Sequence, residues 1–380
     1  MTVSRLACCN WRNISECDVP FRSGINVLWG KNAQGKSNIL ESIYYFARGR
    51  SFRGAKEREL VKFGSDFSSS RLDFRKSGYT KDTSLEAVIQ LSGKKRLTRN
   101  GAQITPSEMM GSFRAVLFSP STLSIVSGGP AERRNYLDVA ISQLSQHYLL
   151  CLRRYTKILN ERNALLKHAA DGLRVTDTEW EVYADGLSEY ASLIASYRNS
   201  YVSRIKDSVS EYFAEMTDGR ELPSMTYTSH ALTEDMHDPF VSSDFRPDAS
   251  VLRKKLTNNV DRECAVGSTL WGIHKDDIQL SLNGKEAKLY ASQGQQRSIA
   301  LAMKLAEAET AFKISGEFPV ILLDDVFSEL DESRRHYILE SLGNDSERQI
   351  IITSCEPDVI PDSHGGNVNF LRVENGSVIA

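Results

Sequence analysis

A short segment near the N-terminus has the residue types and the spacing of a phosphate-binding loop. It fits G-x-x-x-x-G-K-S/T and consists of Gly30, Lys31, Asn32, Ala33, Gln34, Gly35, Lys36 and Ser37. The glycines let backbone N–H groups point at phosphates, Lys36 can reach the β- and γ-phosphates, and the Ser37 hydroxyl can bind Mg²⁺. An apolar run precedes the loop and a helical pattern follows it, which favours a nucleotide site over an ordinary glycine turn.

A pair of carboxylates follows a wholly apolar run, residues 320–323, in "FPVILLDDVFSELD" (318–331). Such a run is typical of a strand buried on both faces of a parallel sheet, and open α/β sheets bind ligands at the carboxyl ends of their strands. We expect Asp324 to hold Mg²⁺, directly or through water, and Asp325 to act with Lys36 in catalysis by polarising the attacking water. A capped turn can look the same, but together with the phosphate-binding loop the two acids indicate nucleotide hydrolysis.

A third segment, "YASQGQQRSIALAMKLAEAE" (290–309), starts with small residues and continues as a helix that Ser292 can cap. It resembles the signature motif S-G-G-Q of ABC-type ATPases, with glutamine replacing the first glycine. The resemblance implies that the segment contacts ATP held by the loop of a second copy, in a head-to-tail, ATP-dependent homodimer. The contacting residues would be Ser292, Gln293, Gly294 and Gln295. "SELD" (328–331) resembles the D-loop of the same interface.

The order of these motifs is similar to that of the SMC-like branch of ABC ATPases, and within that branch the chain resembles the RecF family. The resemblance covers nearly the whole chain, is weakest in 160–260, and rests on "NWRNI" (10–14), "GRSFRGAKERELVKFG" (49–64), "VLFSPSTLSIVSGGPAERRNYLD" (116–138), "GIHKDD" (272–277) and the two acids. It implies that Arg12 and Asn13 lie near the nucleotide. It also implies a recombination mediator at DNA gaps and single-strand/double-strand junctions, with RecO and RecR as partners in loading RecA.

Three features depart from common ABC ATPases. Asp325 stands where those enzymes have glutamate, although RecF proteins resemble this chain there, and the shorter side chain predicts slow, switch-like ATP hydrolysis. The switch histidine of transporters is missing, because the late strand "RQIIITSCEP" (348–357) presents Thr353 and Ser354. No glutamine of Q-loop type is evident near "VLFSP" (116–120).

Two basic clusters are candidates for DNA contact. The first contains Arg48, Arg50, Arg53, Lys56 and Arg58, and the second contains Lys94, Lys95, Arg96 and Arg99. Each cluster alone is more often an ordinary solvated face. Because both lie in the part of the chain that carries the phosphate-binding loop, together they can contact DNA phosphates without reading bases. The chain has no zinc-finger or RRM-like signature, so sequence-specific binding is not indicated.

The elements that must position these residues are of α/β type. Residues 24–30, 113–120 and 320–323 predict strands, "LEAVIQLSGKKRLTRNGAQI" (85–104) predicts a hairpin, and residues 130–170 predict one long helix, with a second helix over 178–217. We therefore predict an ABC-type ATPase head, a mixed sheet with a P-loop, interrupted by a helical hairpin. Its expected parts are 1–128, a helical insert over 129–265, and 266–380. A helical subdomain without such a hairpin is the alternative.

The resemblance implies a DNA-repair ATPase in the cytoplasm, associated with the nucleoid, whereas the composition is that of an ordinary soluble globular protein. The 380 residues are 41% hydrophobic and 25% charged, with a net charge of −2, so DNA contact requires local basic patches. No apolar run is long enough for a membrane span and the six cysteines lack zinc spacing. The alternatives are the ATP-binding subunit of an ABC transporter, against which the insert and the basic clusters argue, and an SMC-type structural ATPase, for which the hairpin is short.

Overall fold

The computed structural model describes residues 1–172, 174–217, 219, 221–229, 247–343, 348–357 and 368–379. Two compact units divide the chain, and each is described by itself. The first unit is Met1–Thr122 with Lys304–Ala380, and the second is Leu123–Met303. The second unit thus includes the segment that resembles the signature motif, whereas the expected division at residues 128 and 265 remains a prediction.

Two sheets form the first unit, one antiparallel with the order β2-β1-β4-β5-β6-β7 and one with the order β15-β14-β3-β13-β12-β8. In the second sheet only the edge strand β15 is antiparallel to its neighbour. The first sheet contains β1 (Thr2–Trp11), β2 (Ile14–Pro20), β4 (Phe67–Arg75), β5 (Thr83–Gln90), β6 (Arg96–Arg99) and β7 (Ala102–Gln103). The second contains β3 (Gly24–Trp29), β8 (Ala115–Phe118), β12 (Val320–Asp324), β13 (Gln349–Ser354), β14 (Val368–Glu374) and β15 (Ser377–Ile379). The strands expected over 24–30, 113–120 and 320–323 and the hairpin over 85–104 are confirmed.

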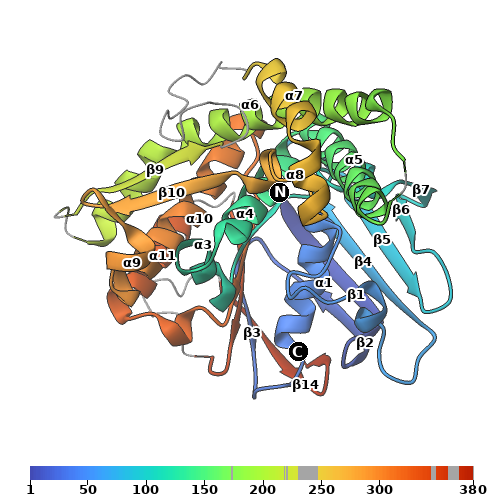
Figure 1. Cartoon of the computed structure of the whole chain (residues 1–380). Coiled ribbons are helices and arrows are strands. Elements are labelled where there is room, and N and C mark those ends of the chain that lie inside the picture. The colour runs from blue at the N-terminus through green and yellow to red at the C-terminus, as the bar shows by residue number, and fades with distance from the viewer. Residues whose placement is uncertain are drawn as a thin grey trace. The chain divides into compact units, whose positions relative to one another are not determined.

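Helix α1 (Lys36–Arg48) contacts strands of both sheets, which explains its composition. Its apolar residues are buried on nearly every side, from Ile39 and Leu40 to Phe46 and Ala47. A helix with so wide an apolar surface is expected in a core rather than at a surface. The sheet strands and α1 therefore fix the loop that joins β3 to α1 (Figure 1). The other helical elements of this unit are η1 (Glu57–Leu60), α2 (Pro106–Met109), η4 (Phe327–Glu329) and α11 (Glu332–Gly343), and η2 (Pro120–Leu123) ends at the boundary between the units.

The second unit contains the predicted helical hairpin, with one correction. Residues 130–170 form two helices, α4 (Pro130–Leu144) and α5 (Gln146–Ala170), because Ser145 leaves the helical conformation and its side chain accepts a hydrogen bond from the Tyr148 N–H. The apolar spacing continues across this break, so spacing alone could not reveal it. Serine is a preferred N-cap residue, and this is the local signal for the break.

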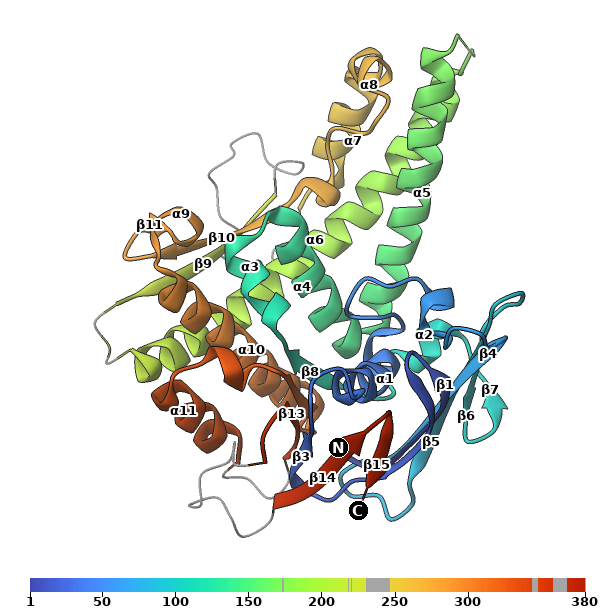
Figure 2. The same cartoon turned by 90° about the horizontal axis from the view of Figure 1, so that it is seen from below.

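Helices α5 and α6 (Asp177–Met216) run antiparallel, as their cross-contacts show (Figure 2). His147 pairs with Tyr197, and Arg154 donates to the Tyr190 hydroxyl at 2.9 Å. Gly186 lies against Ile158 further along the pair. Along these contacts the residue numbers rise in α5 and fall in α6, as in an antiparallel pair. The hairpin prediction is therefore confirmed.

A three-stranded antiparallel sheet, β11-β10-β9, completes the part of the second unit that carries the signature-like segment. Its strands are β9 (Pro223–Thr228), β10 (Asp277–Leu282) and β11 (Lys285–Glu286), and α10 (Gln293–Ser315) follows them and extends across the boundary between the units. The remaining elements are α3 (Ser124–Ser127), α7 (Ala249–Asn258), α8 (Val260–Val266), η3 (Ile273–Lys275) and α9 (Ala287–Tyr290). In the described part of the chain, no helix is both long and apolar enough to cross a membrane.

Candidate nucleotide and DNA site

The phosphate-binding loop follows β3 and ends at α1, where its two glycines are required by the backbone. Gly30 has φ +150°, and a Cβ there would lie 2.4 Å from the Val373 carbonyl oxygen. Gly35 has φ +107°, a backbone conformation that residues with side chains rarely adopt, and a Cβ there would lie 3.2 Å from Asn13 Oδ1 and 3.3 Å from Gly376 Cα. Gly376 also donates its N–H to the Gln34 carbonyl at 2.8 Å, so the turn between β14 and β15 supports the loop. No motif in the sequence signals this support.

Lys36 is buried at the first position of α1, inside the curve of the loop. Its ammonium group donates to the carbonyl oxygens of Gly30 and Lys31, the latter at 2.9 Å. Gly35, the N-cap residue of α1, makes no side-chain cap. The first N–H groups of a helix lack intrahelical partners, so an anion is their natural acceptor. The loop therefore combines a buried cation with available backbone donors, as the sequence predicts.

The two aspartates lie at the carboxyl end of β12, with Thr353 of β13 between them. Asp324 pairs in register with Thr353, which pairs in turn with Leu28 of β3. The Thr353 hydroxyl donates to Asp324 Oδ1 at 3.0 Å and accepts from the Asp325 N–H at 2.9 Å. Asp324 is thereby buried and oriented, whereas Asp325 is exposed with φ +52°. The two acids and the P-loop occupy one edge of one sheet, as expected.

Arg53, predicted to contact DNA, is directed toward this edge. Its guanidinium donates to Asn38 Oδ1 at 2.8 Å and lies 3.8 Å from Asp324 Oδ2. Arg53 is therefore already engaged with the nucleotide edge, and a DNA contact by it stays a prediction.

Arg12 and Asn13 flank the loop from the turn between β1 and β2. Asn13 donates to the Ala33 carbonyl at 3.1 Å, which places it against the P-loop. Arg12 forms a two-pronged ion pair with the buried Glu41, at 2.8 and 2.7 Å, and this bonding raises the pKa of Arg12 above its ordinary value. Glu41 was not among the predicted residues, yet a glutamate on the apolar surface of α1 is a signal, because buried carboxylates need partners.

An open hollow of about 1140 Å³ adjoins Asn13, Asn38 and Arg53 in the first unit. Arg58, Lys62 and the fully exposed Phe63 form other parts of its lining. Cations, amides and an aromatic ring are the groups that a nucleoside can contact.

The basic clusters meet in the same unit. Lys95 of the second cluster forms an ion pair with Glu57 and lies 3.5 Å from the Gly49 carbonyl, beside the first cluster. Lys95 is therefore held by protein contacts, whereas most of the other cluster residues are exposed. The exposed ones are Arg50, Arg53, Lys56, Arg58, Lys94, Arg96 and Arg99.

The signature-like segment starts α10 as a reciprocal cap in the second unit. Ser292 Oγ accepts from the Gln295 N–H at 3.2 Å, and the Ser292 N–H donates to Gln295 Oε1 at 2.6 Å. Gln296 donates to three carbonyls of the preceding turn, including that of Ala291 at 3.1 Å. The predicted cap is confirmed, and a contact of this segment with nucleotide stays a prediction.

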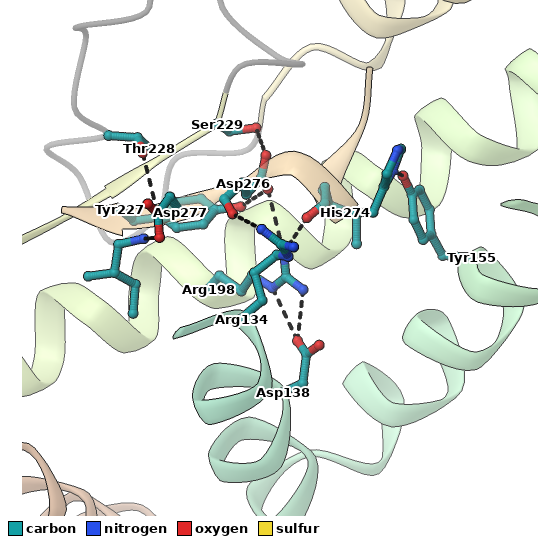
Figure 3. Close-up of polar contacts among 12 residues, drawn as sticks. Arg134, Asp138, Tyr155, Arg198, Tyr227, Thr228, Ser229, His274, Asp276 and Asp277 are labelled. Carbon is teal, nitrogen blue, oxygen red and sulfur yellow. Dashed lines mark hydrogen bonds and ion pairs between the residues drawn. The ribbon is translucent and has the colours of Figure 1, made fainter. Parts of the chain in front are cut away.

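Strands β9 and β10 pair as a two-stranded ribbon. A buried polar cluster holds the end of this ribbon at Thr228 and Asp277 to α4 and α6 (Figure 3). Arg198 of α6 is buried and pairs with Asp138 at 2.8 Å and with Asp276 at 3.6 Å. Asp276, also buried, accepts from the Ser229 and Tyr227 hydroxyls. Burial raises the pKa of Asp276 above its ordinary value, although Arg198 opposes the shift. Such a cluster is costly to break, because a charge left unpaired in the interior costs about 3–5 kcal/mol.

His274 is the neutral member beside this cluster. Its Nδ1 lies 2.8 Å from the Tyr155 hydroxyl, and its Nε2 lies 3.0 Å from the Thr269 carbonyl. Burial lowers the pKa of His274 to about 4. The "GIHKDD" segment, used in the sequence only as a mark of resemblance, thus has a structural role in holding β10.

Comparison with known proteins decides the family. Residues 2–376 match the family model described as RecF/RecN/SMC N terminal domain. The chain is 37% identical over 380 residues to the DNA replication and repair protein RecF of Thermoanaerobacter sp. (strain X514), covering 100% of this chain and 99% of that protein. The chain belongs to the RecF family. A RecF protein of Clostridium novyi (strain NT) is 36% identical over 379 residues, covering 100% of this chain and 99% of the relative.

Solved structures agree with membership of the RecF family. The structure of the recombination mediator protein RecF-ATP in the RecFOR pathway has a TM-score of 0.87 and 34% identity, covering 100% of this chain and 97% of that one. An Smc head bound to the C-winged helix domain of ScpA has a TM-score of 0.56 at 15% identity, and shows the fold alone. The predicted fold, an ABC-type ATPase head with a helical insert, is confirmed.

Proposed function

We propose that this chain is a DNA-repair ATPase that binds ATP and Mg²⁺ and dimerises around ATP on DNA. Slow hydrolysis of ATP then opens the dimer and releases the DNA. One observation carries the proposal: Lys36, Asp324 and Asp325 converge on the edge of one sheet that also presents the P-loop. The 34% identity to a RecF structure with ATP supports the choice of nucleotide.

Each residue of this edge has a distinct proposed role. The P-loop N–H groups and Lys36 bind the phosphates, while the hollow beside Asn13 and Asn38 accepts the base and ribose. Asp325, exposed at the strand end, orients and polarises the attacking water. Thr353 keeps both acids in place through its two hydrogen bonds.

The donor set fits Mg²⁺. In the described part of the chain no group of three or more His, Cys, Asp or Glu residues could hold a metal ion. Mg²⁺ in nucleotide sites needs only one or two protein ligands, since phosphates and waters supply the others. Ser37 and Asp324 provide the hard oxygen ligands, and the ion would neutralise phosphate charge during hydrolysis.

The dimer and its DNA are further parts of the proposal. The signature-like segment would contact the nucleotide of a second copy, so that two ATP molecules join two chains head to tail. The exposed members of the basic clusters would contact DNA phosphates at gaps and single-strand/double-strand junctions. The solved RecF is described as a recombination mediator protein in the RecFOR pathway, which supports RecO and RecR as partners. Loading of RecA with these partners, in the cytoplasm and near the nucleoid, is part of the same proposal.

The hairpin makes a structural tether less suitable as a function. Helix α6 has 40 residues and α5 has 25. At 1.5 Å per residue the longer helix spans roughly 60 Å. The transporter alternative has no supporting observation in the structure.

The proposal is tested by measuring ATP-stimulated binding to gapped DNA at several salt concentrations. Replacing Arg50, Lys56, Arg58, Lys94 and Arg96 by glutamine should weaken binding and lower the salt slope by about 0.9 for each DNA phosphate that the variant no longer neutralises. Replacement of five other exposed cations on α5 and α6 by glutamine serves as the charge-matched control: Arg153, Lys157, Lys167, Arg204 and Lys206. An unchanged slope in the cluster variant contradicts the placement of DNA.

A further inference from the structure

Glu221, two residues before β9, is bound to the signature-like segment although Gln295 lies 74 positions further along the chain. The Gln295 Nε2 group donates to Glu221 Oε1. The same Gln295 amide accepts the Ser292 N–H through Oε1 at 2.6 Å. Both ends of this amide are therefore engaged, and Glu221 and the Ser292 N–H together favour this orientation of the amide.

The orientation of this amide supports one half of the cap at the start of α10. An amide turned around would present N–H groups to the Ser292 N–H, and the hydrogen bond that holds the Ser292 backbone would be lost, whereas the bond from the Gln295 backbone N–H to Ser292 Oγ does not involve the amide. With the cap formed, Ser292 Oγ accepts from the Gln295 N–H and still has its own O–H to donate. A hydroxyl directed in this way is the group that the proposed function requires at a phosphate of the second copy.

The β9–β10 ribbon connects this end to α6. Beside Glu221, Leu222 and Asn283 exchange two hydrogen bonds, both of 2.9 Å. The two strands then pair in register from Pro223 and Leu282 to Thr228 and Asp277. Six residues per strand give a ribbon of roughly 20 Å at 3.3 Å per residue.

At its other end the ribbon is anchored by the buried cluster of Figure 3. Tyr227 and Ser229 of the β9 side bind Asp276, which pairs with Arg198 of α6. Ser210 of α6 lies 3.3 Å from the Pro223 carbonyl and shares its hydroxyl proton between this oxygen and the Lys206 carbonyl of its own helix at 3.1 Å, so α6 contacts the ribbon at both ends. These contacts form a continuous connection from α6 through the ribbon and Glu221 to the cap at Ser292.

We propose that Glu221 is a positioning residue for ATP hydrolysis: it fixes Gln295, and thereby Ser292, and the β9–β10 ribbon makes that position depend on α6. The inference rests on the proposed function, because it supposes that Ser292 contacts nucleotide. Glu221 does not touch the reacting atoms in this account. Its effect passes through Gln295, so the acceptor oxygen matters and the negative charge does not.

The test compares Glu221→Ala with Glu221→Gln in the full-length chain, with Mg²⁺ATP and gapped DNA. Glu221→Ala should lower kcat and the ATP-dependent dimer affinity about tenfold, while the affinity of the monomer for ATP stays within about twofold. Glu221→Gln keeps an acceptor oxygen and should restore kcat. Glu286→Ala removes an exposed carboxylate from neighbouring β11 and is the matched control.

The outcomes separate this inference from the proposed function. If the wild-type chain binds ATP but stays monomeric, the proposed function fails and this inference fails with it. If the wild type dimerises and Glu221→Ala behaves identically, or if Glu221→Gln is equally impaired, only the role of Glu221 is contradicted.

The end of the ribbon at Asp276 and Arg198 is tested separately. Tyr227→Phe should lower kcat about threefold with unchanged ATP affinity, and an unchanged kcat contradicts the link to α6.

Discussion

The first turns of α1 and α10 form a natural comparison, because each follows a loop and each is proposed to act on phosphate. Helix α1 starts at Gly35 without a side-chain cap, and its Lys36 is buried inside the loop. Helix α10 starts with a reciprocal cap between Ser292 and Gln295. The first helix therefore leaves its N–H donors for a ligand, whereas the second satisfies part of its own and has a hydroxyl to offer.

The residues that hold the two helix starts in place also differ in polarity. The P-loop follows β3, in the same sheet as the largely apolar strand β12, every residue of which is buried. The α10 start is joined through the ribbon to charged and polar groups around Arg198 and Asp276. The P-loop, which is proposed to hold phosphates firmly, is therefore supported by an apolar sheet. The start of α10, which is proposed to meet a second chain, is supported by polar contacts whose strength depends on pH and on their neighbours.

The largest expected effect concerns the acid at the P-loop edge. Asp325→Asn should reduce ATP turnover by roughly 10²–10⁴-fold while ATP binding is kept, because the amide cannot polarise water as a carboxylate does. Asparagine tolerates the φ of +52° at this position, so the backbone should not change. Turnover by phosphate release and affinity by equilibrium binding check this, and unchanged turnover removes Asp325 from its role.

Lys36→Ala tests the α1 side of the comparison. We expect ATP affinity to fall by about 100-fold, since the variant has no cation to contact the phosphates and no ammonium bonds to the loop. Lys31→Ala, an exposed lysine of the same loop, should change affinity by less than about threefold. Equal decreases in the two variants would place the phosphates elsewhere.

The buried polar residues of the second unit predict that the stability of the folded chain depends on pH, in part through His274. Its folded pKa of about 4 lies below its ordinary value of 6.5, so the unfolded chain binds the proton first and stability falls as the pH drops from about 7 toward 4. Between pH 7 and 5 the decrease is about 2 kcal/mol. Urea unfolding of the wild type and of His274→Gln at both pH values isolates this contribution, and equal pH dependence in the two proteins would contradict it.

Ser292→Ala tests the α10 side and has the smallest effect. The variant loses the N-cap, which costs about 1 kcal/mol, and also the hydroxyl proposed to contact the nucleotide of the second copy, so we expect dimer affinity with ATP to fall about 20-fold. ATP binding to the monomer should not change, in contrast to Lys36→Ala. A weaker monomer affinity for ATP would show that the two helix starts are not distinct in function.

The sequence predicted the parts of the site that depend on short motifs. The P-loop, the acids at residues 324 and 325, and the cap at Ser292 follow from residue types at fixed spacing. Hydrogen bonds from residues distant in the sequence were missed, because no spacing rule connects such residues to their partners. Examples are the bond from the Gly376 N–H to the Gln34 carbonyl and the bond from Gln295 to the Glu221 carboxylate. The single helix expected over 130–170 was wrong at Ser145, where a local cap outweighed a continuing apolar pattern.

The most direct test of the account measures the molecular mass of the chain on gapped DNA by light scattering, with and without Mg²⁺ATP. The account predicts a dimer with ATP, a monomer without it, and a monomer under both conditions for Lys36→Ala. A wild-type chain that remains monomeric at saturating ATP, or a Lys36→Ala chain that dimerises as readily as the wild type, would contradict it.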